Sequence, residues 1–215
     1  MRLCFHSSPK IWNSISIRLH LNFGIKMFAR WHRRRLAIVS LITLVFYCIL
    51  SSRYSEYKID TIIHRTKPEV VYEYVADFSK MKSLNPTILD FNIVADHGNL
   101  DHWKYSVEYT EQLSHWPYVR NSAVGHYSVR KLPQSEGGQY SVASTHKTCF
   151  ILGFFCLKSN GEFKISYLNE EDTFCQETVH YQCPFLFGWF CRREVEFQRR
   201  AIMVNLNKHF KQKDN

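Results

Sequence analysis

The chain has 215 residues, which is enough for one domain with a buried core and an additional segment. Its formal charge of +9 arises before residue 56, because residues 1–55 contain nine Lys or Arg residues and no acidic residue. The remainder holds 19 of the 28 basic residues against all 19 acidic ones and is neutral. A neutral domain has no overall field that attracts phosphates, so the charge is no argument for nucleic-acid binding, and we expect no nucleic-acid partner.

A basic N-terminal segment, residues 1–35, precedes an apolar one. The stretch LAIVSLITLVFYCIL at 36–50 is free of charge, would span roughly 22 Å as a helix, and is extended by two serines. We interpret 36–52 as a single-pass transmembrane anchor rather than a cleaved signal peptide or a buried core helix. The positive-inside rule then favours the endomembrane or secretory pathway. Residues 1–26 are also typical of a mitochondrial presequence, which keeps that location open.

The next segments alternate between strand and helix signals. Residues 57–64 are rich in β-branched residues and predict a strand. Thr66 and Glu69 have the spacing of a capping box, and Pro68 suits a first helical turn, so a helix is predicted to follow. Residues 79–86 predict a second short helix that ends at Asn85–Pro86.

Six further strands are predicted by alternating polarity and by turn residues between them, and the chain then returns to helical periodicity over 193–213. Short connections between consecutive strands indicate an antiparallel meander, so the fold class is α+β. The predicted strands cover 89–95, 103–110, 120–132, 138–147, 161–168 and 173–182.

This order of elements resembles the START-like (SRPBCC) superfamily, as does the opening IIHRTKPEVVYEYVADFSKMKSLNPTI at 62–88. In style the chain is similar to coenzyme Q-binding and polyketide-cyclase-like members. The resemblance implies a helix-grip fold over residues 56–212: one strand, two short helices and a six-strand meander, forming a curved antiparallel sheet around the long C-terminal helix. An N-terminal transmembrane helix would precede it. The resemblance also implies an apolar cavity between sheet and helix that binds a lipid, sterol, quinone or polyketide.

Two matched apolar runs, CFILGFFCLKS from 149 and CPFLFGWFCRRE from 183, lie in predicted connections. In a meander, alternate connections share one end of the sheet, so both runs are expected beside the connection SHWPYVR at 114–120. We interpret them as a gate that faces the membrane at the cavity mouth, with Gly153 and Gly188 allowing bends. The alternative is an apolar plug of the core. The gate residues are Trp116, Phe150, Ile151, Leu152, Phe154, Phe155, Phe185, Leu186, Phe187, Trp189 and Phe190.

Cysteines flank both runs, and disulfides are expected among Cys149, Cys156, Cys183 and Cys191, either closing each run or joining the two. Buried free thiols are the alternative, and they would suit a cytosolic or matrix location. No CxxC motif or paired His spacing indicates a metal site.

The ligand-lining candidates are the apolar positions of the strands, although any half-buried sheet shows the same alternation. Glu177 shares a face with two of them, but we expect it to point outward. The candidates are Trp103, Tyr105, Tyr109, Tyr127, Val129, Tyr140, Val142, Phe163, Ile165, Tyr167, Val179 and Tyr181.

The sequence predicts a membrane-anchored protein that binds a small hydrophobic ligand, with transfer of that ligand as an open alternative and with no other cofactor. The alternatives are a mitochondrial coenzyme Q-binding protein, a cyclase- or hydrolase-like enzyme, and a protein-interaction domain without a cavity. An enzyme would need a base from His126, His146, His180 or Glu177, but no catalytic constellation is present, so a non-enzyme is expected.

Overall fold

The computed structural model describes residues 31–48, 51–99, 102–131, 139–150, 153 and 155–213. The chain divides into two compact units, Met1–Ser51 and Ser52–Asn215. In the first unit, residues 31–48 form a helix with exposed side chains. Within the described parts of the chain, no helix combines the length and the apolarity of a membrane span. The anchor at 36–52 and the domain at 56–212 stay predictions, and the second compact unit begins at Ser52.

The second unit is built on one antiparallel sheet with the order β1-β7-β6-β5-β4-β3-β2, so the six predicted meander strands are confirmed as consecutive neighbours. The first strand closes the series by pairing with the last one. The strands are β1 (Ser52–Ile63), β2 (Ile88–Gly98), β3 (His102–Gln112), β4 (Arg120–Lys131), β5 (Tyr140–Phe150), β6 (Phe155–Tyr167) and β7 (Thr173–Pro184).

Two short helices, α2 (Pro68–Ala76) and α3 (Phe78–Leu84), separate β1 from β2. Pro68 stands in the first turn of α2 as predicted, but the predicted capping box is wrong, since Lys67 caps the helix without a side-chain hydrogen bond. Glu69 instead accepts hydrogen bonds from the hydroxyls of Tyr140 and Tyr167 at 2.8 and 2.7 Å. The Thr66 hydroxyl donates to the carbonyl of His64 at 3.0 Å, so neither side chain of the predicted box caps the helix.

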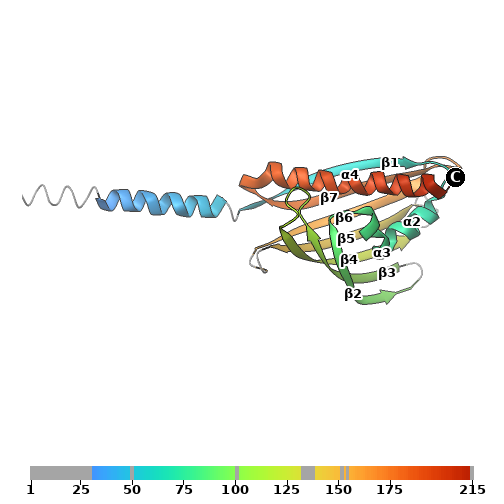
Figure 1. Ribbon diagram of the computed structural model, residues 1–215, viewed down its shortest axis with the longest axis horizontal. Coiled ribbons are helices and arrows are strands. Elements are labelled where there is room, and N and C mark those ends of the chain that lie inside the picture. The colour runs from blue at the N-terminus through green and yellow to red at the C-terminus, as the bar shows by residue number, and fades with distance from the viewer. Residues whose placement is uncertain are drawn as a thin grey trace, which may run out of the picture. The chain divides into compact units, whose positions relative to one another are not determined.

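The last helix, α4 (Gly188–Lys213), follows a 3₁₀ turn at Phe185–Phe187. Figure 1 shows α4 along the curved sheet beside β1, with α2 and α3 towards its C-terminal end. Ile202, Leu206 and Phe210 recur at helical spacing and are buried against the sheet, which produces the grip. At the far end of α4, Tyr74 of α2 stacks on His209 with ring centroids 4.2 Å apart. The opposite end of the sheet, where α4 begins, is the end at which an opening to the interior can lie.

Candidate functional site

Two adjoining hollows lie between the inner face of the sheet and α4. The mouth pocket has a volume of about 130 Å³ and the inner pocket about 40 Å³. Both are lined by Tyr109, Glu111, His146 and Arg199, so these residues mark where the pockets meet. Pockets for drug-sized ligands usually measure about 300–1,000 Å³. A lipid-sized ligand therefore requires the walls to move apart.

The mouth pocket opens between the β5–β6 hairpin and the first turn of α4, where Phe150, Leu157, Phe190 and Cys191 line it. Trp116, from the connection between β3 and β4, stacks on Phe190 with ring centroids 5.0 Å apart. The connections β3–β4, β5–β6 and β7–α4, which were predicted to share one end of the sheet, thus meet at the mouth.

We call the apolar side chains around this opening the aromatic rim. Five of them are exposed, led by Trp189 at 68 %, and three are half-buried. Ile151, Leu152 and Phe154 lie outside the described residues, so their assignment to the gate stays a prediction. The rim comprises Trp116, Phe150, Phe155, Phe185, Leu186, Phe187, Trp189 and Phe190.

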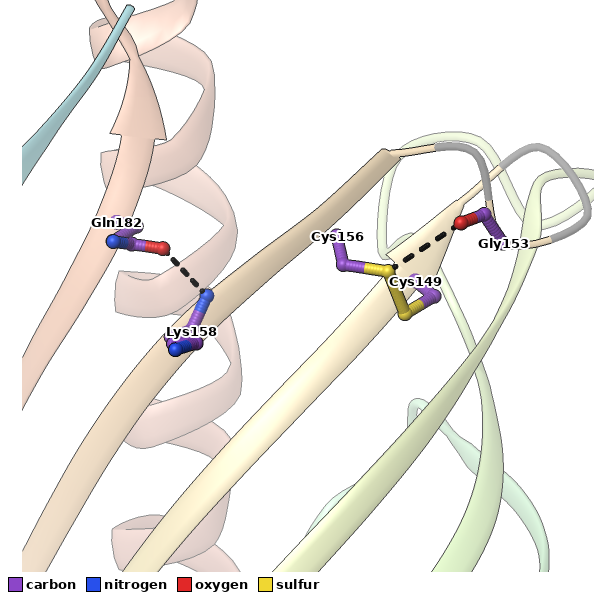
Figure 2. Close-up of a disulfide and its surroundings, with 5 residues drawn as sticks. All are labelled: Cys149, Gly153, Cys156, Lys158 and Gln182. Carbon is purple, nitrogen blue, oxygen red and sulfur yellow. Dashed lines mark hydrogen bonds between the residues drawn. A yellow bond between two sulfur atoms is a disulfide. The ribbon is translucent and has the colours of Figure 1, made fainter.

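Two disulfides close the two apolar runs individually, Cys149–Cys156 and Cys183–Cys191. Figure 2 shows the first bridge at the tip of the β5–β6 hairpin, where its two cysteines are directly opposed residues. Gly153 in the same hairpin has a φ of 92°, a conformation that suits glycine. Gly188 has an ordinary helical φ of −53°, so its backbone conformation there does not require glycine.

A buried ion pair joins α4 to β7 above the inner pocket. Arg199 Nη1 donates to Glu177 Oε1 at 2.7 Å, and the Glu177 side chain is only 2 % exposed. The expectation that Glu177 points outward is therefore wrong, and the physical reason is the guanidinium that α4 brings to it. Burial raises the pKa of the Glu177 carboxyl above its ordinary value, although the charge of Arg199 and its hydrogen bond oppose this shift.

A second buried carboxylate, Glu111 of β3, has no comparable ion pair within the described part of the chain. It is 8 % exposed, and its Oε1 accepts a hydrogen bond of 3.1 Å from Asn121 Nδ2 on β4. Burial raises the pKa of Glu111 to about 7, despite the opposing effects of Arg199 and Asn121. Glu111 is thus close to half ionised near neutral pH.

The other polar side chains in the pocket walls are hydrogen-bonded to neighbouring residues. The Tyr109 hydroxyl and His146 Nδ1 are hydrogen-bonded at 3.0 Å, and burial lowers the pKa of His146 to about 3, so this imidazole is neutral. Its ring fits because Gly125 lies opposite on β4, where an added Cβ would stand 2.9 Å from His146 Nδ1. Glu194 of α4 accepts bonds of 2.9 and 2.6 Å from the Ser114 amide and hydroxyl.

Three buried polar atoms at the two pockets have no hydrogen-bond partner among the residues that the structure describes: Asn121 Oδ1, Glu177 Oε2 and Arg199 Nε. An unsatisfied buried polar atom costs about 1–3 kcal/mol. Three of them beside two pockets mark a place where a ligand's polar group would be stabilised.

The twelve ligand-lining candidates divide evenly. Tyr109, Tyr127, Val142, Phe163, Val179 and Tyr181 line one or both pockets. The other six lie elsewhere: Trp103, Tyr105, Val129, Tyr140 and Ile165 belong to or pack against the core cluster, and Tyr167 is half exposed beside Glu69.

The pockets also contain residues that the sequence analysis did not select, above all Glu111, Asn121 and Arg199. A signal existed for two of them. Glu111 continues the inward alternation of Tyr105 and Tyr109, and Arg199 falls on the buried stripe of α4 three residues before Ile202.

The solved structures that resemble this chain share its fold. A START superfamily protein from Mycobacterium smegmatis matches with a TM-score of 0.51 and 14 % identity over 73 % of this chain and 97 % of the other. The Zhui aromatase/cyclase from Streptomyces sp. R1128 matches with a TM-score of 0.53 and 12 % identity over 77 % and 97 % of the two chains. Human STARD10 matches with a TM-score of 0.56 and 10 % identity over 73 % of this chain and 63 % of the other.

No protein-family model and no curated protein sequence matches the chain. At these identities the structural similarity establishes the fold, which is START-like and of the helix-grip type.

Proposed function

We propose that this protein is a membrane-anchored module that binds a hydrophobic amphiphile, such as a lipid, sterol or quinone, between its sheet and α4. The observation that carries the proposal is the mouth pocket, which runs from an apolar opening at Phe150 and Phe190 to polar walls at Glu111 and Arg199. A gradient from apolar to polar is what an amphiphile with one polar end requires.

The aromatic rim is proposed to face the membrane and to act as the gate. Ser52, at the start of β1, is directly opposite Pro184, which precedes Phe185. The chain of an anchor at 36–52 therefore enters this unit beside the rim. Large apolar side chains contribute about 1.5–3 kcal/mol each when they leave water, so the exposed ones together support insertion into a bilayer surface.

We propose an oxidising compartment for the domain, with the basic N-terminus in the cytosol. Both cysteine-flanked runs are closed by disulfides, and such bridges persist in secretory compartments rather than in the cytosol or matrix. This favours the secretory alternative over the mitochondrial one.

Binding without catalysis is proposed because the four bases named from the sequence are unsuited to proton transfer on a ligand, and Glu111, whose pKa of about 7 would suit a base, is bonded only to the neutral amide of Asn121 among the described residues. His126 and His180 are exposed. His146 has a pKa of about 3, and Glu177 is committed to Arg199.

The binding proposal is tested by native mass spectrometry. The full chain is embedded in lipid nanodiscs and released from them in the mass spectrometer with its ligand bound, and the ligand is then identified after solvent extraction. A bound amphiphile at stoichiometric level is expected. Val179→Trp, which adds a large side chain to the wall of the mouth pocket, should abolish it, whereas Thr178→Trp on the opposite face of β7 should not. Equal occupancy in both variants would place the ligand elsewhere and refute the cavity as its site.

Tryptophan quenching by brominated phospholipids tests the rim. In vesicles that carry the full chain, replacing Trp189 by Phe should remove part of the quenched emission, because this side chain would enter the bilayer. Trp103→Phe is the matched control, since Trp103 lies near the β2–β3 turn and is hydrogen-bonded to Asp96. Unchanged quenching in the Trp189 variant would contradict a membrane-facing rim.

A further inference from the structure

The charges that line the two pockets are unbalanced in one direction. Three buried carboxylates, Glu111, Glu177 and Glu194, contribute to the walls. Among the described lining residues, the cations are Arg199 and Lys158, and the Lys158 side chain is exposed at the mouth. Arg199 is paired with Glu177, and His115 Nδ1 stands 3.8 Å from Glu194 Oε2, so Glu111 is the carboxylate that has no cationic partner among the described residues.

The buried polar atoms that have no hydrogen-bond partner among the described residues also favour a ligand that donates hydrogen bonds. Two of the three, Asn121 Oδ1 and Glu177 Oε2, are hydrogen-bond acceptors on side chains that are at most 4 % exposed. The third, Arg199 Nε, is a donor on a side chain that is 20 % exposed. A head group that only accepts hydrogen bonds, such as a quinone carbonyl, would leave both acceptors unsatisfied. A carboxylate or phosphate would add negative charge to walls that already hold too much.

We propose that the pocket binds a long-chain amphiphile with its head inward, and that the head group is a protonated amine held by Glu111 and Asn121 Oδ1, which line the mouth pocket together. An ammonium group has N–H donors and no acceptor, which suits the carboxylate of Glu111 and the unpartnered Oδ1 of Asn121 in the wall of one pocket. Its charge compensates the carboxylate that has no ion pair of its own. This inference rests on the proposed function, because it names the ligand class of the same cavity.

The apolar mouth defines the direction of the bound molecule. Phe150, Leu157 and Phe190 line the opening, so a hydrocarbon tail leaves the pocket along these side chains. The tail of a head-inward ligand therefore extends towards the aromatic rim, and the walls need to widen only around a narrow chain. Binding with the head inward therefore requires less movement of α4 than enclosing a whole lipid would.

The experiment compares three photo-reactive dodecyl probes that carry a diazirine on the carbon nearest the head and differ only in the head: an amine, an alcohol and a carboxylate. The full chain is held in phosphatidylcholine nanodiscs at about neutral pH, where the amine is protonated and the carboxylate is ionised. Labelling of the peptides from β3, β4 and α4 is measured by mass spectrometry and divided by the probe content of the same particles. The ratio removes differences in partitioning into the lipid.

We expect the amine to label these peptides about ten- to a hundredfold more than the carboxylate, as charge-assisted hydrogen bonds in a buried site predict. The alcohol should fall between the two. Glu111→Gln, which keeps the shape and removes the charge, should reduce the preference for the amine over the alcohol to about equality. Glu108→Gln on the outer face of the same strand is the matched control and should keep that preference.

The outcomes separate the two proposals. Labelling of the pocket by all three probes alike, or best by the alcohol or the carboxylate, would overturn the amine inference and leave the hydrophobic-ligand function standing. An amine preference that survives Glu111→Gln would overturn it as well. If no probe labels the pocket peptides, the proposed function fails and this inference fails with it.

Discussion

Replacing Glu111 by Gln should stabilise the protein, and the stabilisation should grow as the pH rises. In the folded state the pKa of this carboxyl is about 7, because burial disfavours its charged form, whereas its ordinary value is 4.5. The folded chain therefore holds the proton over a pH range in which the unfolded chain has released it. Because the folded state binds more protons there, the free energy of unfolding decreases as the pH rises through this range.

The magnitude follows from the two pKa values. They differ by about 2.5 (7 − 4.5), and one pKa unit corresponds to about 1.4 kcal/mol. The ionised carboxylate thus destabilises the folded state by on the order of 3 kcal/mol once the pH is well above 7. Domains of this kind have total stabilities of about 5–15 kcal/mol, so the effect is large. The amide introduced by Glu111→Gln would keep the bond from Asn121 Nδ2 while removing the titration.

The assay is urea unfolding of the full chain in neutral detergent, followed by near-ultraviolet circular dichroism at about pH 5 and about pH 8. The difference in unfolding free energy between Glu111→Gln and the parent should increase by roughly 2.5 kcal/mol between these conditions, because a small part of the effect is already present at about pH 5. Glu108→Gln, on the exposed face of β3, should show no such increase. A difference for Glu111→Gln that is the same at both pH values would refute the buried, uncompensated state of this carboxyl.

Three further changes test other contacts. Tyr105→Phe removes the 2.7 Å hydrogen bond from the buried hydroxyl to the carbonyl of Ala76, and it should lower the unfolding free energy by about 1–3 kcal/mol in a urea titration. Arg199→Leu leaves Glu177 buried without its cation and should destabilise the fold by about 3–5 kcal/mol; adding Glu177→Gln should restore much of this loss, and no restoration would contradict the ion pair. On reduction the intact mass of the protein should rise by about 4 Da, which is two hydrogen atoms for each disulfide, and an unchanged mass would show free thiols.

The strands and helices could be predicted because their side chains alternate at the periods of the two structures. The boundaries of the strands and helices at the two apolar runs could not be predicted. The strand predicted at 161–168 begins at Phe155 in the structure, and the helix predicted from residue 193 begins at Gly188. Continuous apolar runs carry no period, so their structure is decided by pairing with a neighbouring strand and by the disulfides rather than by local pattern.

The site was only partly predictable for a different reason. Alternation assigns a residue to a face of the sheet, and this identified Tyr109, Val179 and Tyr181 correctly as inward-facing. It does not tell which polar residue tolerates burial, since that depends on a partner from a distant element. Glu177 was expected outside because its cation, Arg199, comes from α4 and is invisible in the pattern of β7.

The two buried carboxylates, Glu111 and Glu177, differ in whether a partner within the fold accounts for their burial. Glu177 has a guanidinium at 2.7 Å, and a paired buried charge has a sufficient structural reason to exist. Glu111 is bonded only to a neutral amide among the described residues, although a glutamine would keep that bond and avoid the charge. A residue that destabilises the fold where a neutral substitute of the same shape is available indicates a requirement outside folding. Because Glu111 lies in the wall shared by both pockets, that requirement is most simply a ligand whose head group supplies the missing positive charge.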